Sequence, residues 1–379
     1  MFKKVISIVL ITIFLAMSIV GCGTKETAAT KKSVADYKIG IVTPTLSTSE
    51  DEFRAADNMK KKYPDIVEHI TLPENFSTEI QTAISQITSL ADNPKMKAIV
   101  VVSGQSGLLP ALQKVKEKRP DIITITAPIW DDPEMMSKYV DINLDTDWAR
   151  RGVTIVEKAQ KMGAKTFIHY SFPTHLAKES VAKRRDKMKE TCQKLGIQFV
   201  EVVTPDPQTG NGPAAMQQFL REDLPRQIAK YGKDTNVFGS NCPMYDVIID
   251  EALKQKFIVA EQCCPTPTQA FPTVMNLEIA KEDAGNFDKI NKMITEKAAK
   301  ADMTGRLSGW PMPATIFLPE YAVELGKYMI DNNAKADKVM NEEFLNKFAK
   351  DKFKVGVDFK KLKPESKNYF MFVMDSIIY

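Results

Sequence analysis

The chain has 379 residues, and at roughly 150 residues per domain this length predicts two to three domains with sizeable apolar cores. Hydrophobic residues make up 44% and charged residues 26%, which is ordinary globular usage and excludes wholesale disorder, collagen-like repeats and a polytopic membrane protein. Lys and Arg number 52 against 48 Asp and Glu, a balance too even for the basic surface that nucleic-acid binding needs. We therefore expect no nucleic-acid partner.

The first residues have the pattern of a targeting segment. Two lysines in Met1–Lys4 precede an uncharged run, Val5–Val20, that is too short to span a bilayer comfortably and typical of a secretory signal. The run ends in Ile19-Val20-Gly21-Cys22, which resembles a bacterial lipobox, and this resemblance implies a diacylated Cys22 after removal of residues 1–21. An ordinary signal peptide or an uncleaved anchor with an incidental cysteine is the alternative.

A polar stretch without apolar periodicity, residues 22–36, predicts a flexible tether. Two acyl chains anchor a protein stably where one does not. We expect the body to lie outside the cytoplasm, held to the cell membrane by the lipid alone.

The first half of the body alternates short β-branched runs with helical patterns. Four strands are expected, at 38–42, 65–70, 98–102 and 121–126, and their starts fall about 23 to 33 residues apart, which is the span of a βαβ unit. Between them, Ile80, Ile84, Ile87 and Leu90 recur on one face of a predicted helix over 77–90. This alternation predicts a parallel sheet covered by helices.

The same alternation repeats after Asp145. A helix is expected through Lys161, and further strands are expected at 165–169, 198–203, 235–238 and 257–260. Beyond Cys264 the pattern loosens, with a helix near 278–297, a segment at 318–330 that is expected to complete the second lobe, and a strand at 369–374. The predicted fold class is α/β, with two doubly wound parallel-sheet lobes whose loops converge beyond the carboxyl ends of the strands.

The order of these elements carries a resemblance. The lipobox, the Tyr37–Thr43 strand, the Ala98–Gly104 strand with its small-residue loop, and the second wound lobe are together similar to type 1 periplasmic (solute) binding proteins. Within that group the chain most resembles an uncharacterised clostridial-type lipoprotein family known by a domain-of-unknown-function label. The resemblance implies three crossovers between the lobes, which we expect near 141–147, 265–273 and 306–313.

The expected crossovers divide the chain into discontinuous lobes. The N-terminal lobe is expected to comprise residues 37–145 and 272–308, and the C-terminal lobe residues 146–271 and 309–379. The cleft between them is the default ligand site.

Residues just after the predicted strands are polar, aromatic and slightly acidic. Hydroxyls and amides can replace the water around a polyhydroxylated ligand while aromatic rings stack on its apolar face, which suits a sugar, a nucleoside or a similar small polar molecule. Each of these residues could instead cap a helix or satisfy its own turn. The candidate ligand-binding residues are Thr43, Thr45, Ser103, Gln105, Ser106, Trp130, Asp131, Phe172, Asn241 and Glu261.

Motifs for catalysis and cofactors are missing from the sequence. Gly104–Gly107 lacks the Lys and Gly spacing of a phosphate-binding loop, and none of the three histidines belongs to an HExxH motif or a nucleophile elbow. No CxxC or Cys/His spacing indicates structural zinc. We expect neither an enzyme nor a cofactor, although a triad assembled in space stays open. Arg150 and Arg151 could clamp an anion, but a solvated helix start is the simpler interpretation.

The adjacent pair Cys263-Cys264 leaves three interpretations open. A disulfide from one of them to Cys242 would form a structural clip near the site, and buried small apolar thiols are an equal alternative. A soft-metal site is the third. The basic run at 183–189 is interpreted as a solvated helix face.

The resemblance as a whole implies a solute-binding lipoprotein that delivers a small polar ligand to an ABC permease. A sensor that signals to a membrane receptor is the first alternative, and an extracytoplasmic enzyme is the second. A transcriptional regulator would need a helix-turn-helix before residue 37, where the signal-like segment lies.

Overall fold

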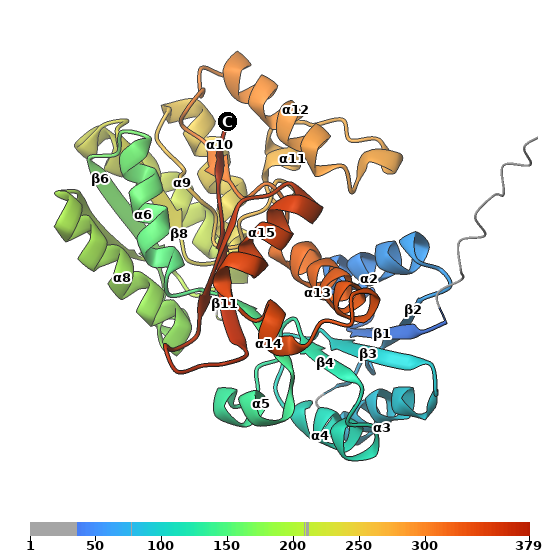
Figure 1. The fold of residues 1–379 in the computed structure, drawn as a ribbon. Coiled ribbons are helices and arrows are strands. Elements are labelled where there is room, and N and C mark those ends of the chain that lie inside the picture. Colours follow the sequence, from blue (N-terminus) through green and yellow to red (C-terminus); the bar gives the residue numbers. More distant parts are fainter. Residues whose placement is uncertain (1–35, 77, 208, 210–211) are drawn as a thin grey trace, which may run out of the picture. The chain divides into compact units, whose positions relative to one another are not determined.

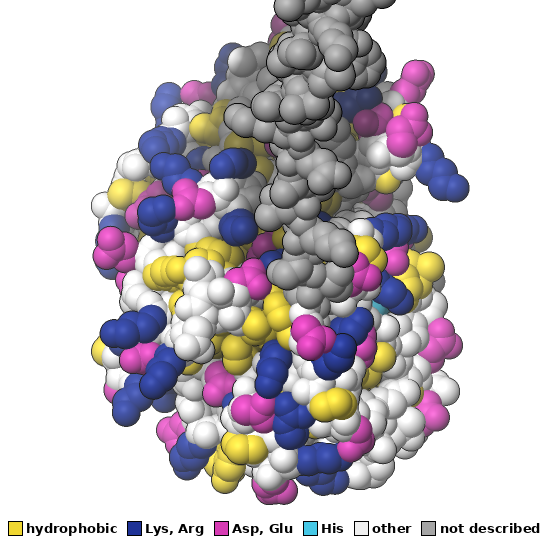
Figure 2. Space-filling model, turned by 45° about the vertical axis from the view of Figure 1, so that its right-hand side comes forward, with side chains coloured by type: hydrophobic (Ala, Val, Ile, Leu, Met, Phe, Trp, Pro, Cys, Tyr) yellow, Lys and Arg dark blue, Asp and Glu magenta, His cyan; other side chains and the backbone are white. Residues whose placement is uncertain are grey.

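A computed structural model describes residues 36–76, 78–207, 209 and 212–379, of which Tyr37–Tyr379 belong to one compact unit. The expected signal peptide, the lipidated Cys22 and the tether up to residue 35 lie outside the described residues. No helix among the described residues combines the length and the apolar character needed to cross a bilayer. On the face shown in Figure 2, acidic and basic side chains are intermixed, as the near-even charge count predicts.

The first lobe is built on a seven-stranded sheet in the order β10-β11-β5-β4-β3-β1-β2. Its strands are parallel except β10, which runs antiparallel to β11. Every residue of Ala98–Val101 is fully buried, because helices cover both faces of the sheet. The strands are β1 (Lys38–Thr43), β2 (Val67–Thr71), β3 (Met96–Val101), β4 (Ile123–Thr126), β5 (Ile142–Thr146), β10 (Val357–Lys361) and β11 (Tyr369–Met374).

Helices α2 and α13 lie on one face of this sheet and α3 and α4 on the other (Figure 1). The predicted apolar stripe is confirmed in α3, where Ala83, Ile84 and Ile87 enter the core. α13 is buried around most of its circumference because it packs on the sheet and on α2. The helices are α2 (Glu50–Lys62), α3 (Ile80–Ser89), η1 (Leu90–Asp92), α4 (Leu109–Lys118), α5 (Pro133–Tyr139), α13 (Ala314–Asp331), α14 (Ala336–Val339) and α15 (Glu342–Phe353).

The second lobe has a parallel sheet of β6 (Thr166–Ser171), β7 (Gln198–Val203) and β8 (Thr235–Gly239) in the order β7-β6-β8. Parallel bridges Asn236–Ile258 and Val259–Leu307 continue it, so the strand expected at 257–260 is present only as isolated bridges. The edge is a short antiparallel pair, β9 (Ser308–Gly309) and β12 (Ile377–Ile378).

Helices surround the second sheet, and a single glycine permits the closest approach among them. A Cβ at Gly152 would lie 2.4 Å from the carbonyl oxygen of Arg184, so only glycine lets α6 and α8 pack this tightly. The helices are α6 (Arg151–Lys161), α7 (Pro173–Leu176), α8 (Glu179–Leu195), α9 (Gly212–Tyr231), η2 (Cys242–Met244), α10 (Tyr245–Gln255), α11 (Phe271–Val274), η3 (Lys281–Asp283) and α12 (Phe287–Lys300).

The chain crosses between the two sheets three times, but not at all of the expected places. The crossings are at 147–150 between β5 and α6, at 310–313 between β9 and α13, and at 375–376 between β11 and β12. The segment 265–273, expected to cross, stays in the second lobe, where Phe271 is fully buried in the core. Its proline-rich composition indicated a connector, but the connector returns to the lobe that it left.

The expected division after residue 271 is therefore reversed in the structure. Ile290, Ile294 and Ala298 of α12 are buried in the second-lobe core, so 272–308 does not join the first lobe. The segment 309–379 does not join the second lobe either, except for its last residues. α13 packs on the first sheet and β11 pairs with β5 there, because their apolar faces fit that sheet.

A buried ion pair connects the three crossings. Arg151, at the start of α6, is fully buried and directs Nη2 to Glu261 Oε2 at 2.9 Å, where Glu261 is only 2% exposed. The other carboxylate oxygen of Glu261 accepts hydrogen bonds from Trp310 Nε1 at 3.2 Å and from Ser376 Oγ at 2.5 Å. One carboxylate thus binds groups from the second and third crossings and from the helix that follows the first.

Replacing Glu261 tests the importance of this pair. Glu261→Gln leaves the Arg151 guanidinium buried without a counter-charge, and we expect the free energy of unfolding to fall by about 3–5 kcal/mol in urea titrations. The matched control is Glu179→Gln, which removes the exposed pair with Lys183 and should leave the unfolding curve unchanged. Equal effects of the two substitutions would contradict a structural role for the buried pair.

Candidate functional site

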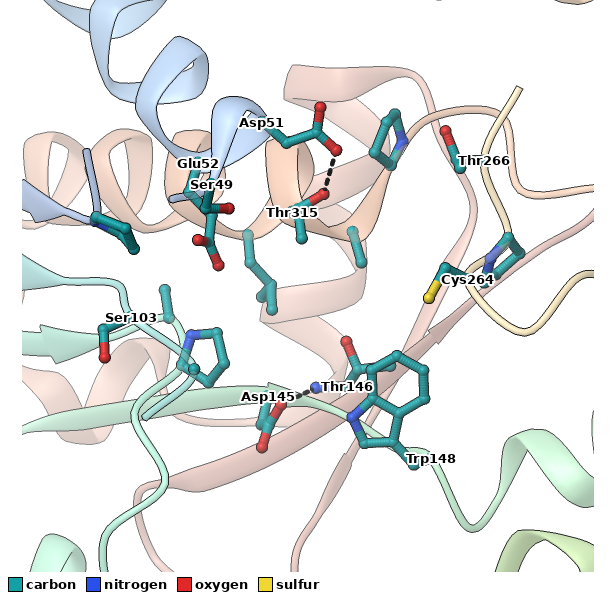
Figure 3. A pocket seen from close by; sticks show the side chains of 18 of the residues that line it. Ser49, Asp51, Glu52, Ser103, Asp145, Thr146, Trp148, Cys264, Thr266 and Thr315 are labelled. Atoms are coloured by element: carbon teal, nitrogen blue, oxygen red, sulfur yellow. Dashed lines mark hydrogen bonds between the residues drawn. The ribbon is translucent and has the colours of Figure 1, made fainter. Parts of the chain in front are cut away.

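A cavity of about 580 Å³ lies where the carboxyl ends of the first-lobe strands face the second lobe (Figure 3). Its volume falls within the range of about 300–1,000 Å³ that is typical of small-molecule sites. The loops after β1, β3 and β4, the strand β5 and the first turns of α2 and α13 supply one side. The other side comes from the segment 264–269 of the second lobe, and Trp148 and Trp310 come from crossings.

The cavity wall is aromatic and acidic. Trp130, Trp148 and Trp310 line it together with the carboxylates of Asp51, Glu52 and Asp145, and its described lining contains no lysine or arginine. The complete described lining is Pro44, Thr48, Ser49, Asp51, Glu52, Ser103, Gly104, Gln105, Ala127, Pro128, Trp130, Asp145, Thr146, Trp148, Cys264, Pro265, Thr266, Thr268, Gln269, Trp310, Pro313, Ala314, Thr315 and Leu318.

Trp130 is held at the wall by the loop after β3. Its backbone N–H donates to the carbonyl of Gln105 at 2.9 Å, and its ring packs beside Gly104, which adopts a left-handed conformation with φ +56°. The side chain is nevertheless 54% exposed, although tryptophan normally buries most of its large apolar surface. A ring fixed at its base and exposed to a cavity is a surface on which a ligand can stack.

Two acids at the cavity have raised pKa values because they are removed from water. Burial raises the pKa of Asp145 to about 7, a shift opposed by the Thr146 N–H, which donates to Oδ1 at 2.6 Å, and increased by the charge of Asp147. Burial also raises the pKa of Glu52, against a hydrogen bond from Ser49. Near neutral pH the Asp145 carboxyl can therefore either donate or accept a proton.

A second compartment of about 450 Å³ adjoins the first and shares Trp130, Asp145, Trp148 and Cys264 with it. Its other lining residues carry different chemistry, since they include a buried cation, an imidazole and a thiol. These residues are His175, Ser180, Val181, Arg184 and Cys263.

Arg184 is the buried cation of this second compartment. Its side chain is 3% exposed, its guanidinium carbon lies 5.1 Å from the centre of the Phe238 ring, and its Nε has no hydrogen-bond partner. Nη2 lies 3.5 Å from the sulfur of Cys263. Among the described residues no carboxylate forms an ion pair with Arg184.

Three thiols meet beside Arg184. The sulfurs of Cys242 and Cys264 lie 2.9 Å apart, and the Cys263 thiol donates to the carbonyl of Ser240 at 2.8 Å. Hydrogen bonds from Cys242 and Cys264, and then the charge of Arg184, lower the pKa of Cys263. The four described cysteines are unpaired in the structure, so the disulfide, one of the three interpretations left open, is not formed there, and Cys264 lines the cavity instead of lying buried.

The structure brings three of the predicted ligand residues to the cavity. Ser103 and Gln105 follow β3 and Trp130 follows β4, and all three line it. These strands lie next to each other in the sheet, so their loops meet as expected for the carboxyl edge of a parallel sheet.

Four other predicted residues of the first lobe serve local structure. Thr43 is buried and bonds to His69 Nε2 at 2.8 Å, and Thr45, which is not in the cavity lining, bonds to Ser47 and to the lining residue Thr48. Ser106 donates to the carbonyl of Trp130, and Asp131 accepts from the three backbone N–H groups of 107–109 at the start of α4.

The three predicted residues of the second lobe also lie away from the cavity lining. Phe172 is 2% exposed and its ring stacks on His175, with 5.2 Å between ring centres. Asn241 precedes the short helix η2, and Glu261 is engaged by Arg151. The anion clamp considered for Arg150 and Arg151 is not formed either, since Arg150 pairs with Asp358 at 2.8 Å.

Several lining residues were outside the sequence prediction. Asp145 lies inside β5 instead of in a loop, Trp310 lies in an expected crossing but was not proposed as a site residue, and Thr315 belongs to a segment expected in the other lobe. Figure 3 shows Thr315 bonded to Asp51, across the first turns of α13 and α2. Arg184 belongs to the basic run interpreted as a solvated face, but it is buried because it lies on the inward face of α8, where its guanidinium packs on Phe238.

The raised pKa of Asp145 predicts a pH dependence of stability. The native carboxyl titrates near pH 7 and the unfolded one near 3.8, so the native state binds more protons between these values. The free energy of unfolding should therefore fall as the pH rises from about 4 to about 7, by up to about 4 kcal/mol from this group. Urea titrations across this range should show the slope in the wild type and a reduced slope in Asp145→Asn. An unchanged slope in the variant would contradict the assignment.

Comparisons with known proteins agree with this architecture. A crystal structure from Clostridium difficile 630, provisionally described as a transcriptional regulator, is 42% identical with a TM-score of 0.89, covering 91% of this chain and 99% of that one. A structure from Actinomyces odontolyticus described as a sugar ABC transporter has a TM-score of 0.50 at 10% identity, covering 79% of this chain and 85% of that one. The predicted fold class, that of type 1 periplasmic binding proteins, is confirmed.

Two sequence relatives from Treponema pallidum are described only as uncharacterized. A protein of Treponema pallidum (strain Nichols), described as uncharacterized, is 34% identical over 194 residues, which are 49% of this chain and 88% of that protein. The model of one family matches residues 37–308, most of the described body. The chain therefore belongs to the family described as "Protein of unknown function (DUF3798)".

Proposed function

We propose that the protein is an extracytoplasmic solute-binding lipoprotein that captures a small polar ligand between its lobes. One observation carries the proposal, namely a cavity of about 580 Å³ lined from both lobes by three tryptophans and hydrogen-bonding side chains. The fold shared with the structure described as a sugar ABC transporter supports it.

The lining favours a ligand with hydroxyl groups and an apolar ring face, such as a sugar or a nucleoside. Carboxylates of Asp51, Glu52 and Asp145 accept hydrogen bonds from hydroxyls, while the exposed Trp130 ring offers a stacking surface. The acidic wall disfavours a ligand whose charge is negative at this end of the cleft. Ser103, Gln105 and Trp130 remain the ligand residues that we propose from the sequence, and Asp145, Trp148 and Thr315 join them.

Ligand binding would favour a closed arrangement of the lobes. A ligand shifts such an equilibrium only by the contacts that it makes in the closed state and lacks in the open one. Thr315 and Asp51 stand on the first lobe and Thr266 and Cys264 on the second, so one molecule in the cavity touches both. The crossings at 147–150, 310–313 and 375–376 are the hinges of this proposal.

The proposed location and partner follow from the sequence pattern at the N-terminus. The lipobox-like segment ending at Cys22 supports a lipid anchor at the outer face of the membrane, and the partner would be an ABC permease that accepts the ligand. The protein is proposed to bind without catalysis.

The provisional description of the Clostridium difficile relative suggests a second function, regulation of transcription. Residues 5–20 form an uncharged apolar run instead of the amphipathic helices of a helix-turn-helix, which favours the lipoprotein. A sensor that reports ligand to a membrane receptor shares the same cleft. A permease gene beside the protein's own gene would support delivery of the ligand over sensing.

A thermal-shift screen against sugars, nucleosides, amino acids and small peptides tests the proposal. A ligand that binds only the native state must raise the unfolding temperature. In Trp130→Ala we expect the affinity for the hit to fall about 10-fold, the cost of about 1.4 kcal/mol of lost stacking. The matched control is Tyr139→Ala, an exposed aromatic side chain outside this cavity.

The screen also separates binding from turnover. Recovery of the ligand unchanged after long incubation supports a binding protein, whereas its conversion favours an enzyme. A hit whose affinity is unaffected by Trp130→Ala would contradict the proposed site.

A second substitution tests the proposed anchor. Cys22→Ser removes the thiol that would be acylated, and we expect the protein to lose the incorporation of labelled fatty acid that the wild type shows. Cys192→Ser is the control, because Cys192 is buried in the second-lobe core. Continued labelling of Cys22→Ser by fatty acid would contradict the lipoprotein assignment.

A further inference from the structure

Three cysteines from two separate segments converge beside the cleft. Cys242 follows β8. Cys263 and Cys264 lie 21 and 22 residues later in the sequence, after α10. Their three sulfurs lie within 4.8 Å of one another. Cys192, on α8, is apart from this group in the second-lobe core. The fold thus gathers three soft ligand atoms at one point.

The residues around these thiols favour negative charge on the sulfurs. Arg184 is buried next to Cys263, and among the described residues it has no carboxylate partner. Its Nε is also without a hydrogen-bond partner. A buried cation without a counter-ion is costly, so an arrangement that places anionic sulfur beside it is favoured.

We propose that Cys242, Cys263 and Cys264 bind one thiophilic divalent cation of the zinc and cadmium class through three thiolates, with Arg184 as the counter-charge. Three thiolates and a divalent ion leave one net negative charge, which the guanidinium neutralises. Thiolates select soft and borderline cations over magnesium and calcium, which prefer oxygen. Each thiol releases one proton to solvent when it binds the ion, and no oxidation is involved.

The spacing of the sulfurs suits such an ion. Zinc–sulfur bonds of about 2.3 Å place sulfurs around a tetrahedral ion roughly 3.8 Å apart, which side-chain rotation reaches from the observed positions. Cys263 now donates to the Ser240 carbonyl and would give up that hydrogen bond. Cys263 and Cys264 also line the second compartment, and the Cys264 sulfur points into the first cavity in Figure 3. The fourth coordination position therefore faces the cleft, where water or a ligand atom can occupy it.

Titration of the reduced protein with cadmium alone, and then with zinc in competition, tests this site. We expect one ion per chain by native mass spectrometry, a thiolate-to-cadmium charge-transfer band in the ultraviolet, and protection of three thiols from a thiol reagent. Cys242→Ser and Cys264→Ser should each weaken binding by at least about 10-fold, because even loss of a group that only supports a metal ligand costs about 10–100-fold. Cys192→Ser, the matched control, should bind cadmium like the wild type, with folding of every variant checked by circular dichroism.

Three results would overturn the proposal. The first is a reduced, folded protein that binds no cadmium, and the second is a Cys192→Ser variant that loses as much affinity as Cys264→Ser. The third is bound cadmium that leaves all four of these thiols reactive. If the reduced protein binds no cadmium and protein prepared in air shows a Cys242–Cys264 disulfide by peptide mapping, the cluster is a redox clip. None of these outcomes depends on the small-molecule screen, so the metal site and the proposed solute binding can fail separately.

Discussion

The Glu261 carboxylate is the point on which the connection of the two lobes depends. It accepts from Arg151, which begins the helix after the first crossing, from Trp310 in the second crossing and from Ser376 in the third. Arg151 in turn donates to the carbonyls of Gln262 and Cys263, both at 2.7 Å, and its guanidinium carbon lies 5.2 Å from the ring centres of Trp148 and Trp310. Because the ion pair and the two rings occupy one buried position, the three crossings cannot shift independently without breaking a buried charge interaction.

The same group of residues shapes the cavity. Trp148 and Trp310 both pack against Arg151 and line the cavity, but Trp310 is only 1% exposed, so Trp148 offers the more open surface. Their orientation as a binding surface is therefore set by the cation behind them, since a guanidinium near an aromatic face is stabilised by the ring quadrupole. Glu261 thereby acts on the cavity indirectly, although the sequence interpretation placed it in contact with ligand. A carboxylate after a strand was a sound reason to expect function nearby, but its neighbours along the chain did not reveal its buried partner.

The sequence predicted the regular elements well where burial on both faces or an apolar stripe leaves a strong pattern. β3 and β6 were expected within two residues of their observed starts, and α3 has the expected stripe. The division of the last hundred residues could not be obtained in the same way. The proline-rich segment near 265–272 has the composition of a connector whether it crosses or returns, and only the packing of Phe271 and α12 decides between them. The final crossing occupies two residues, too few to leave a pattern.

The candidate site was predictable to the extent that it consists of loops after strands. Ser103, Gln105 and Trp130 obey that rule, because β3 and β4 are neighbours in the sheet. Asp145 does not, since it lies within a strand and its raised pKa comes from burial that the sequence does not show. Arg184 is the clearest failure. Its neighbours Lys183 and Arg185 face solvent or surface carboxylates, and the charge run therefore resembles an ordinary exposed helix face.

The burial of Arg184 follows from its position on the inward face of α8. Arg184 shares the buried face of α8 with Val181 and Met188, so its side chain points inward beside Cys263, while Gly152 lets α6 lie against the α8 backbone at the same level. The cleft has two chemical ends, an acidic one at Asp51 and Glu52 and a thiol-rich one with a buried cation at Arg184, and Asp145 lines both compartments. Apolar residues at these positions would cost less to bury. The presence of charged groups and thiols beside the cavity therefore needs a reason other than stability. Recognition is such a reason, because opposite electrostatic character at the two ends of a cleft distinguishes the two ends of whatever binds there.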